Sequence, residues 1–305
     1  MKLLIAYDGS GNSRTAINDL QNAGLPAKTE AVIISVSEIY LPRFGEKDFA
    51  QADEDIAMYF QKHREQSERN IIETNKLAVE AKEKLQKRFP EWTIKTEVVS
   101  GSPTQRILSK SHEFEPDLIV LGAQGLSWSE ETRLGNVAQI VLTEAKCAVR
   151  MTKAKSDKTT QKLKIAICFD NSPDSIKAVK AVASRNWKAE PEIGIFIVTG
   201  FIDPLIPGRV FRVLEGLPEK DLKGEREWAE SLAGNAFDIL RDAGFSASLK
   251  IFNGNPRMVL ADKTKNWGAD LAFVGARSGE SEFSSLGSVA LAVAARAACP
   301  VEIIR

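Results

Sequence analysis

The chain repeats itself, and this internal duplication constrains its fold more than any other feature of the sequence. An apolar run ending in Asp-x-Ser occurs twice, so that Asp8-Gly9-Ser10 in the first half corresponds to Asp170-Asn171-Ser172, 162 positions later. Four matches in the same order, this one included, predict two copies of one domain. The other three are Gly101-Ser102-Pro103 with Gly254-Asn255-Pro256, residues 117–123 with residues 270–276, and Cys147-Ala148-Val149 with Cys299-Pro300-Val301.

The length of the chain agrees with two domains. A domain takes roughly 150 residues, and the chain has 305. Residues 153–161 are polar and show no apolar periodicity, and they lie between the last apolar run of the first copy and the first run of the second. We therefore expect a first domain at residues 1–152, a linker at 153–161 and a second domain at 162–305.

Short apolar runs alternate with helical patterns in each copy. Apolar positions on one face predict helices at residues 13–20 and 136–143, and Ser172 followed by Pro173 predicts the N-cap and first turn of another. Because strands that alternate with helices need crossover connections, we predict an α/β fold of two doubly wound domains. Each domain would hold a mainly parallel five-stranded sheet flanked by helices, with strands one and four as neighbours. The predicted strands of the first copy are residues 3–7, 31–36, 93–99, 118–122 and 148–151.

A charged, helix-favouring stretch occupies residues 52–88 within the first copy. Its apolar residues are spaced too loosely to prove one continuous helix. We expect one long, partly exposed helix there, or two, with the charged residues forming a solvated face.

Composition excludes several classes of function. Forty-one basic residues balance 41 acidic ones, so no net field attracts nucleic acid. The N-terminus lacks the basic segment, apolar stretch and cleavage site of a secretory signal, from which we expect a cytoplasmic protein. The most apolar late stretch, residues 288–304, contains Arg296, Pro300 and Glu302, so no membrane span is expected there.

Cysteine and histidine give no sign of metal or disulfide chemistry. Cys147, Cys168 and Cys299 are an odd number and form no Cys-x-x-Cys pair, which favours small core residues in a reducing compartment. His63 and His112 stand apart from other ligand-type residues, so we expect structural roles for both and no metal ligands.

The glycines after the predicted fourth strand form the motif that most clearly indicates ligand binding. Gly122-Ala123-Gln124-Gly125 is followed, after nine residues, by Gly135-Asn136-Val137, which opens a helix. Glycine lets the backbone approach a ligand closely, and a helix N-terminus offers unpaired amides at the positive end of its dipole. Ligands of doubly wound sheets bind outside the carboxyl ends of the strands, where Asp8 also lies, so the pattern predicts a phosphate site. Glycines also make plain turns, and Asp8 and Asp170 can cap turns, so both interpretations stay open.

On these motifs the sequence resembles the universal stress protein family, whose ATP-binding members carry Gly-x2-Gly-x9-Gly followed by Ser or Thr. The resemblance implies a fold like that of the adenine nucleotide alpha-hydrolases. It also implies binding of ATP or another adenine nucleotide, with magnesium, in a stress-response or regulatory role. The matching features cover nearly the whole chain: Gly122, Gly125 and Gly135, the aspartates Asp8 and Asp170, Val36 and Val198 ending the second strands, both Gly-x-Pro triplets, and the closing strands.

The resemblance implies roles for single residues of the first copy. Asp8 would hydrogen-bond the ribose or the adenine. Asn136 stands where the family has a hydroxyl, although its amide can also donate or cap the helix. The remaining implied roles are Ala6 and Val36 lining the adenine slot, Leu121 and Gly122 along the sugar and first phosphate, Gly125, Gly135, Asn136 and Val137 as donors to the phosphates, and Arg133 as a nearby charge.

The second copy departs further from the family pattern. The third residue after Gly275 is Ser278 instead of glycine, and Glu280 and Glu282 add negative charge to the loop. We therefore expect the first copy to be the better binder, although Gly287-Ser288 restores the Gly-Ser pair. The counterpart residues of the second copy are Asp170, Val198, Gly275, Ser278, Gly287, Ser288 and Val289.

Two other nucleotide-binding folds fit less well. A dinucleotide-binding domain needs Gly-x-Gly-x-x-Gly after strand one and an acid after strand two, but residues 8–13 lack this spacing and only Glu38 could serve as the acid. The Ser-Gly-Gly-x-Asp-Ser loop of the ATP pyrophosphatases is also missing there. Since no positioned base, nucleophile elbow or carboxylate cluster appears, we predict no catalytic residues and at most slow ATP hydrolysis.

Two further expectations concern interactions. By the same resemblance, the two domains would pack against each other through their final strands, and whole chains would associate further into a homodimer. The alternative to nucleotide binding is an interaction or scaffold protein of the same fold, which would work through surfaces such as residues 52–88.

Overall fold

The computed structural model describes residues 1–37, 54–124, 134–153, 162–199, 222–277 and 286–305. We call residues 1–153 the N-terminal half and residues 162–305 the C-terminal half. The N-terminal half contains β1 (Lys2–Ala6), α1 (Gly11–Asp19), η1 (Leu20–Asn22), β2 (Glu30–Ser37), α3 (Glu54–Arg88), β3 (Thr93–Ser100), α4 (Pro103–Phe114), β4 (Leu118–Gly122), α5 (Asn136–Glu144) and β5 (Ala148–Thr152). The C-terminal half contains β6 (Lys164–Cys168), α6 (Pro173–Ala183), β7 (Glu192–Thr199), α7 (Leu222–Asp242), β8 (Ala247–Asn253), α8 (Pro256–Trp267), β9 (Leu271–Gly275), α9 (Ser288–Arg296) and β10 (Val301–Ile304).

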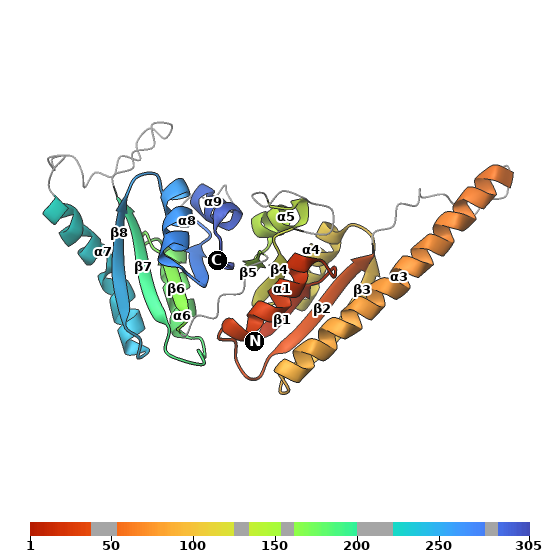
Figure 1. Ribbon diagram of the computed structural model, residues 1–305, viewed down its shortest axis with the longest axis horizontal. Coiled ribbons are helices and arrows are strands. Elements are labelled where there is room, and N and C mark those ends of the chain that lie inside the picture. Colours follow the sequence, from red (N-terminus) through yellow and green to blue (C-terminus); the bar gives the residue numbers. More distant parts are fainter. Residues whose placement is uncertain (38–53, 125–133, 154–161, 200–221, 278–285) are drawn as a thin grey trace.

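The strands of both halves form one sheet, in the order β3-β2-β1-β4-β5-β10-β9-β6-β7-β8. Neighbouring strands within each half are parallel. Strands β5 and β10 join the two halves as an antiparallel pair, and Figure 1 shows the two halves side by side. The predicted α/β fold is confirmed, including the five strands of each half and the pairing of strands one and four. The expected packing through the final strands is confirmed too, and it makes the two predicted sheets continuous.

Helices cover both faces of the sheet, and the two faces are packed differently. On the face covered by α4, α5, α8 and α9, one apolar cluster runs across both halves and includes Val149, Met151, Val301 and Ile303 of the joining strands. On the other face, each half has its own apolar cluster. Because side chains alternate along a strand, Arg150 and Glu302 point to this second face, between the two separate clusters.

Helix starts follow the capping residues. The helix predicted from residue 13 begins at Gly11, because the Ser10 side chain caps it by accepting a hydrogen bond from the Ser13 amide at 3.2 Å. Ser172 caps α6 as predicted. The prolines of the two Gly-x-Pro triplets, Pro103 and Pro256, lie in the first turns of α4 and α8.

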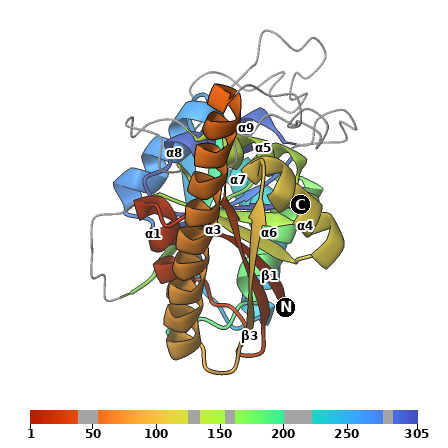
Figure 2. The same ribbon diagram turned by 90° about the vertical axis from the view of Figure 1, so that its right-hand side faces the viewer.

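The charged stretch forms a single long helix, α3, from Glu54 to Arg88; residues 52 and 53 lie outside the described part of the chain. Its C-terminal part packs on the sheet through Ala78, Ala81 and Leu85, which are fully buried. The N-terminal part extends beyond the sheet (Figures 1 and 2). The expectation of a long, partly exposed helix is therefore confirmed.

The cysteines and histidines lie in ordinary structural positions. Cys168 and Cys299 are buried and Cys147 is half-buried, whereas His63 lies on α3 against the ring of Tyr59 and His112 is exposed on α4. Among the described helices, none combines the length and apolarity that a membrane span requires.

Candidate functional site

The carboxyl edge of the N-terminal half gathers most of the predicted site residues. Strands β1 and β4 are direct neighbours, with Leu3 beside Leu118 and Ile5 beside Val120, so the chain leaves both strands at the same edge. Asp8 follows β1 there, and Gly122 ends β4. The Gly135 amide, at the start of α5, donates to the Ala123 carbonyl at 2.8 Å. The loop after β4 therefore begins and ends beside the end of β1.

The side chain of Asp8 holds the turn after β1. The Ser10 amide donates to Asp8 Oδ1 at 2.9 Å, and Gly9 between them has a φ of 75°. The C-terminal half repeats this turn with a 3.0 Å bond from the Ser172 amide to Asp170 Oδ1. The interpretation of both aspartates as turn caps is thus confirmed. Asp8 is also exposed at this edge of the sheet.

Gly122 lets helix α1 approach the end of β4. A Cβ at this position would stand 2.8 Å from the Asn12 carbonyl carbon and from the Ser13 amide nitrogen, and backbone atoms cannot rotate away. Gly275 has the same function in the C-terminal half, where a Cβ would stand 2.6 Å from the Ser175 amide nitrogen. Sequence reasoning assigned the close approach at Gly122 to a ligand. In the structure, α1 makes this approach to Gly122, and α6 makes the same approach to Gly275.

Helix α5 opens without a side chain that could cap it from the N-cap position. Its N-cap is Gly135, whereas Ser10, Ser172 and Asn255 cap α1, α6 and α8 through their side chains. The first-turn amides of α5, including that of Asn136, therefore remain available at the carboxyl edge, together with the positive end of the helix dipole. Helix α9 starts in the same way, with Gly287 as its N-cap.

The residues predicted to line the adenine slot lie at the ends of β1 and β2. Ala6 and Val36 are partly buried against the shared apolar cluster, as is Val137 of α5. The side chain of Leu121 is buried in that cluster, so only its backbone can lie along a sugar. Gly125 and Arg133 of the predicted set lie outside the described residues, as do Ser278, Glu280, Glu282 and Glu38.

The matching positions of the C-terminal half carry bulkier side chains. Cys168 stands where the N-terminal half has Ala6, and Phe252 stands where it has Val99. The ring of Phe252 packs on Phe196, with 5.3 Å between the ring centres, beside the partly buried Val198. The C-terminal half therefore carries larger side chains than the N-terminal half at these two positions.

An ion-pair cluster that sequence reasoning missed lies at the same edge of the C-terminal half. Asp174 accepts from Lys177 Nζ at 2.9 Å and lies 3.3 Å from Arg277 Nε. Burial alone would raise the pKa of Asp174, but hydrogen bonds and charges from Lys177 and Arg277 hold it below its ordinary value. The repeat itself contained the signal, because Asp174 and Arg277 correspond to the uncharged Asn12 and Gln124.

The hydroxyl that restores the family pattern in the C-terminal half already has a partner. Arg257 Nε donates to Ser288 Oγ at 3.0 Å, at the first residue of α9, beside Val289. Across the described residues of both halves, no group of three histidine, cysteine, aspartate or glutamate side chains is arranged to hold a metal ion.

Comparison with known proteins gives a consistent picture. The sequence model described as Universal stress protein family matches twice, at residues 1–153 and 163–305. A universal stress protein of Methanocaldococcus jannaschii is 37% identical over 76 residues, which cover 24% of this chain and 45% of that protein, less than half of its length.

Two solved structures are similar to the whole fold. One is a universal stress protein from Archaeoglobus fulgidus, 19% identical, with a TM-score of 0.62 over 100% of this chain and 98% of the other. The second is a functionally unknown protein from Pseudomonas aeruginosa, 14% identical, with a TM-score of 0.57 over 99% of this chain and 92% of the other.

Proposed function

The chain belongs to the universal stress protein family over both of its halves, and from this membership we propose that it binds an adenine nucleotide of the ATP class in its N-terminal half, in a stress-response or regulatory role. One observation carries the proposal. The N-cap of α5 is Gly135, which has no side chain to bond the first-turn amides, and it lies at the edge of the sheet where β1 ends and Asp8 follows. Main-chain amides and a helix dipole at such an edge are suited to phosphate.

The described residues fit the parts of a nucleotide. Adenine would lie against Ala6 and Val36, the ribose near Asp8, and the phosphates at the first-turn amides of α5, beginning with that of Asn136. The Gly135 amide, which the resemblance also implied as a phosphate donor, instead donates to the Ala123 carbonyl. Val137 follows in the same first turn, the backbones of Leu121 and Gly122 lie between the two ends, and by resemblance Gly125 and Arg133 complete the set. Magnesium would arrive with the nucleotide, coordinated by its phosphate oxygens.

The groups gathered at this edge suit binding better than turnover. Among the described residues, the groups assigned to the nucleotide are main-chain amides, one carboxylate and apolar side chains, which suit orienting a nucleotide rather than activating a water molecule. We therefore propose a binding protein with at most slow ATP hydrolysis, and a cytoplasmic location is part of the same proposal. The predicted domain boundaries, 1–152 and 162–305 with a linker at 153–161, are part of the same proposal.

The N-terminal half is proposed as the better site for two physical reasons. Cys168 and Phe252 are larger than Ala6 and Val99, the residues at the matching positions of the N-terminal half, and would narrow a site for adenine there. In addition, Glu280 and Glu282 add negative charge to the segment after β9, where phosphates would approach. A weaker site at Asp170, Gly275, Ser278, Gly287, Ser288 and Val289 remains part of the proposal.

An interaction protein is the second candidate function, and α3 favours it. Met58, Tyr59 and Ile72 are 65%, 54% and 56% exposed on this helix, whose N-terminal part extends beyond the sheet (Figure 1). Large apolar side chains exposed along a helix can belong to a contact surface. In this alternative the fold is retained and nucleotide binding is absent.

Calorimetric titration with ATP and magnesium separates the two candidates when two matched variants are included. Asp8→Ala and Asp170→Ala remove the same type of turn hydrogen bond, 2.9 and 3.0 Å long, so their structural effects are comparable. We expect Asp8→Ala to weaken the tighter ATP binding by about tenfold or more, as for loss of a hydrogen bond to a charged group, and Asp170→Ala to leave this tighter binding unchanged.

Other outcomes of this titration are equally informative. Failure of the wild-type protein to bind ATP, ADP or AMP would contradict the proposal and leave the interaction protein as the better candidate. Loss of binding in Asp170→Ala, with Asp8→Ala unaffected, would move the site to the C-terminal half.

A further inference from the structure

The joining strands are centred on one pair of equivalent residues. Along the antiparallel pair, Val301 lies beside Met151, Glu302 beside Arg150, and Ile303 beside Val149. In the internal repeat, Arg150 corresponds to Glu302, 152 positions later. The local twofold axis that relates the halves therefore passes between Arg150 and Glu302. A pair of two like halves, joined in this way, would place the same residue opposite itself.

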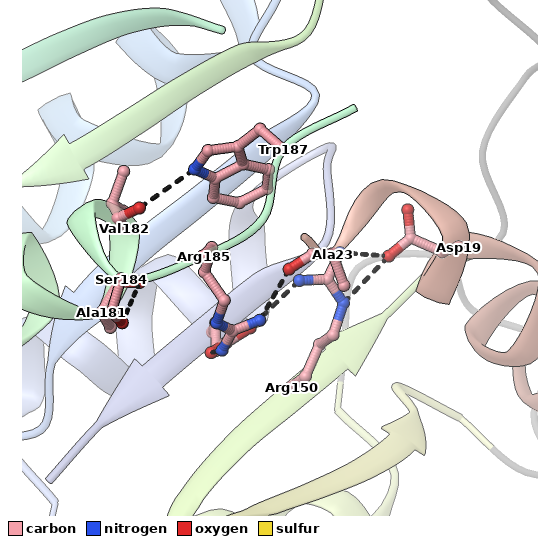
Figure 3. A network of polar contacts seen from close by, with 9 residues as sticks. Asp19, Ala23, Arg150, Ala181, Val182, Ser184, Arg185 and Trp187 are labelled. Carbon is pink, nitrogen blue, oxygen red and sulfur yellow. Dashed lines mark hydrogen bonds and ion pairs between the residues drawn. The ribbon is translucent and has the colours of Figure 1, made fainter. Parts of the chain in front are cut away.

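Arg150 and Glu302 form a buried ion pair on this axis. Arg150 Nη1 lies 3.1 Å from Glu302 Oε2, and both side chains are fully buried. Each also pairs within its own half, Arg150 with Asp19 at 2.5 Å and Glu302 with Arg185. Figure 3 shows the side chains of Arg150 and Arg185 reaching toward the same region from the two halves. Charge thus alternates in sign along Asp19, Arg150, Glu302 and Arg185, and each half supplies one acid and one base.

The flanking contacts distinguish the halves by shape. Gly24, in the N-terminal half, has a φ of 61°, and a Cβ there would stand 2.8 Å from the Trp187 ring and 2.9 Å from Arg185 Cβ. The position equivalent to Gly24 is Asn186, whose amide donates to the Gly24 carbonyl at 2.8 Å. Arg185 Nη1 also donates to the Ala23 carbonyl (Figure 3). Two C-terminal halves would have no glycine at this position to accommodate Trp187.

Other contacts of the interface are the same from both sides. Lys153 Nζ donates to the Ala295 carbonyl near the end of α9, and Arg305 Nη2 donates to the Leu142 carbonyl in the last turns of α5. Lys153 and Arg305 are equivalent in the repeat, and each binds carbonyl oxygen at the C-terminal end of a helix in the other half. Such contacts would form equally well between like halves. They hold the halves together without selecting the partner.

We propose that Arg150 and Glu302 make each joining edge selective for the unlike half. The β5 edge of an N-terminal half accepts the β10 edge of a C-terminal half and rejects a second β5 edge. A pair of N-terminal halves would bury two guanidinium groups face to face, and a pair of C-terminal halves two carboxylates, each neutralised only by Asp19 or Arg185 of its own half. Like charges without water are strongly unfavourable, so the unlike pair prevails.

Free re-pairing of the two halves tests this selectivity. A protease site placed within residues 154–161 of the full-length protein allows the folded chain to be cut; the product is then unfolded in urea and refolded by dilution. Native mass spectrometry counts the recovered pairs, since the halves differ in mass. We expect unlike pairs to exceed each like pair by more than about tenfold, whereas random pairing would make only half of all pairs unlike.

Two variants assign the selectivity to its residues. In Arg150→Met/Glu302→Met, the excess of unlike pairs over pairs of N-terminal halves should fall toward the random value, while pairs of C-terminal halves stay rare because of Trp187. In the control, Lys153→Met/Arg305→Met, all pairs should weaken and the preference should remain. Random pairing of the wild-type halves, or an unchanged preference in Arg150→Met/Glu302→Met, would overturn the proposal.

Discussion

Replacing Arg150 with alanine is expected to lower the free energy of unfolding by about 3–5 kcal/mol, the usual effect of removing one partner of a buried ion pair. The guanidinium is fully buried and bonds to both Asp19 and Glu302. Burial would lower the pKa of Arg150, but these two carboxylates raise it overall, so the group is charged in the folded protein. Without it, Glu302 keeps only Arg185. Urea unfolding at neutral pH measures the loss.

A surface arginine provides the matched control. Arg64 also pairs with a glutamate, Glu68 at 3.3 Å, but its side chain is 80% exposed. Arg64→Ala should change the free energy of unfolding by less than about 1 kcal/mol. Equal effects of the two substitutions would show that the Arg150 pair contributes no more than an exposed one. The double substitution Arg150→Met/Glu302→Met should lower the free energy of unfolding by less than the sum of Arg150→Met and Glu302→Met made singly. In the double variant, neither Arg150 nor Glu302 remains as a charge facing an apolar residue in the place of its partner.

Gly122→Ala is expected to destabilise the protein by about 1–3 kcal/mol, the usual cost of overpacking. The added Cβ would stand 2.8 Å from main-chain atoms of Asn12 and Ser13, and relief requires the start of α1 to move away from β4. The same movement would displace the turn that holds Asp8, so ATP affinity should fall as well. Urea unfolding and ATP titration measure the two effects.

Gly11→Ala is the control for this substitution. Gly11 is the first residue of the same helix, and nothing lies within 4 Å of the Cβ that alanine would add. The free energy of unfolding of the Gly11→Ala protein should stay within about 0.5 kcal/mol of the wild-type value, because surface substitutions away from special features have small effects. A Gly122→Ala protein as stable as Gly11→Ala would contradict the packing function assigned to Gly122.

The fold was predictable because its signals are local and occur twice. Apolar runs separated by helical patterns predict parallel strands, and four matches in the same order indicate a duplicated domain. Capping also acts over a few residues, which is why Ser172-Pro173 predicted the start of α6 correctly. The start of α1 was placed two residues late, because the cap at Ser10 was not recognised although it matches Ser172.

The contacts between the halves depended on information that no local pattern contains. The partner of Arg150 is set by an antiparallel register between strands 152 residues apart, and Asp19 reaches it from α1. One signal was nonetheless available. Extending the match of Cys147-Ala148-Val149 by a single residue aligns Arg150 with Glu302, two opposite charges inside otherwise apolar closing strands.

The site was predictable as a place but not as a set of contacts. The ends of β1 and β4 meet because strand order follows from the fold class, so the position of Asp8 beside the glycines could be foreseen. The contact of Gly122 with α1 and the ion pairs of Asp174 arise from packing between elements far apart in the chain. Such packing leaves no periodic trace in the sequence.

Photolabelling with an ATP analogue that carries its reactive group on the adenine tests the central claim most directly, because it identifies the half that holds the base. After tryptic digestion of the wild-type protein, label should appear in the peptides with Ala6 and Val36, residues 3–14 and 29–43, and unlabelled ATP should suppress it. Stronger label in the corresponding peptides of the C-terminal half, residues 165–177 and 189–209, than in those of the N-terminal half, or label that ATP does not suppress, would contradict the account.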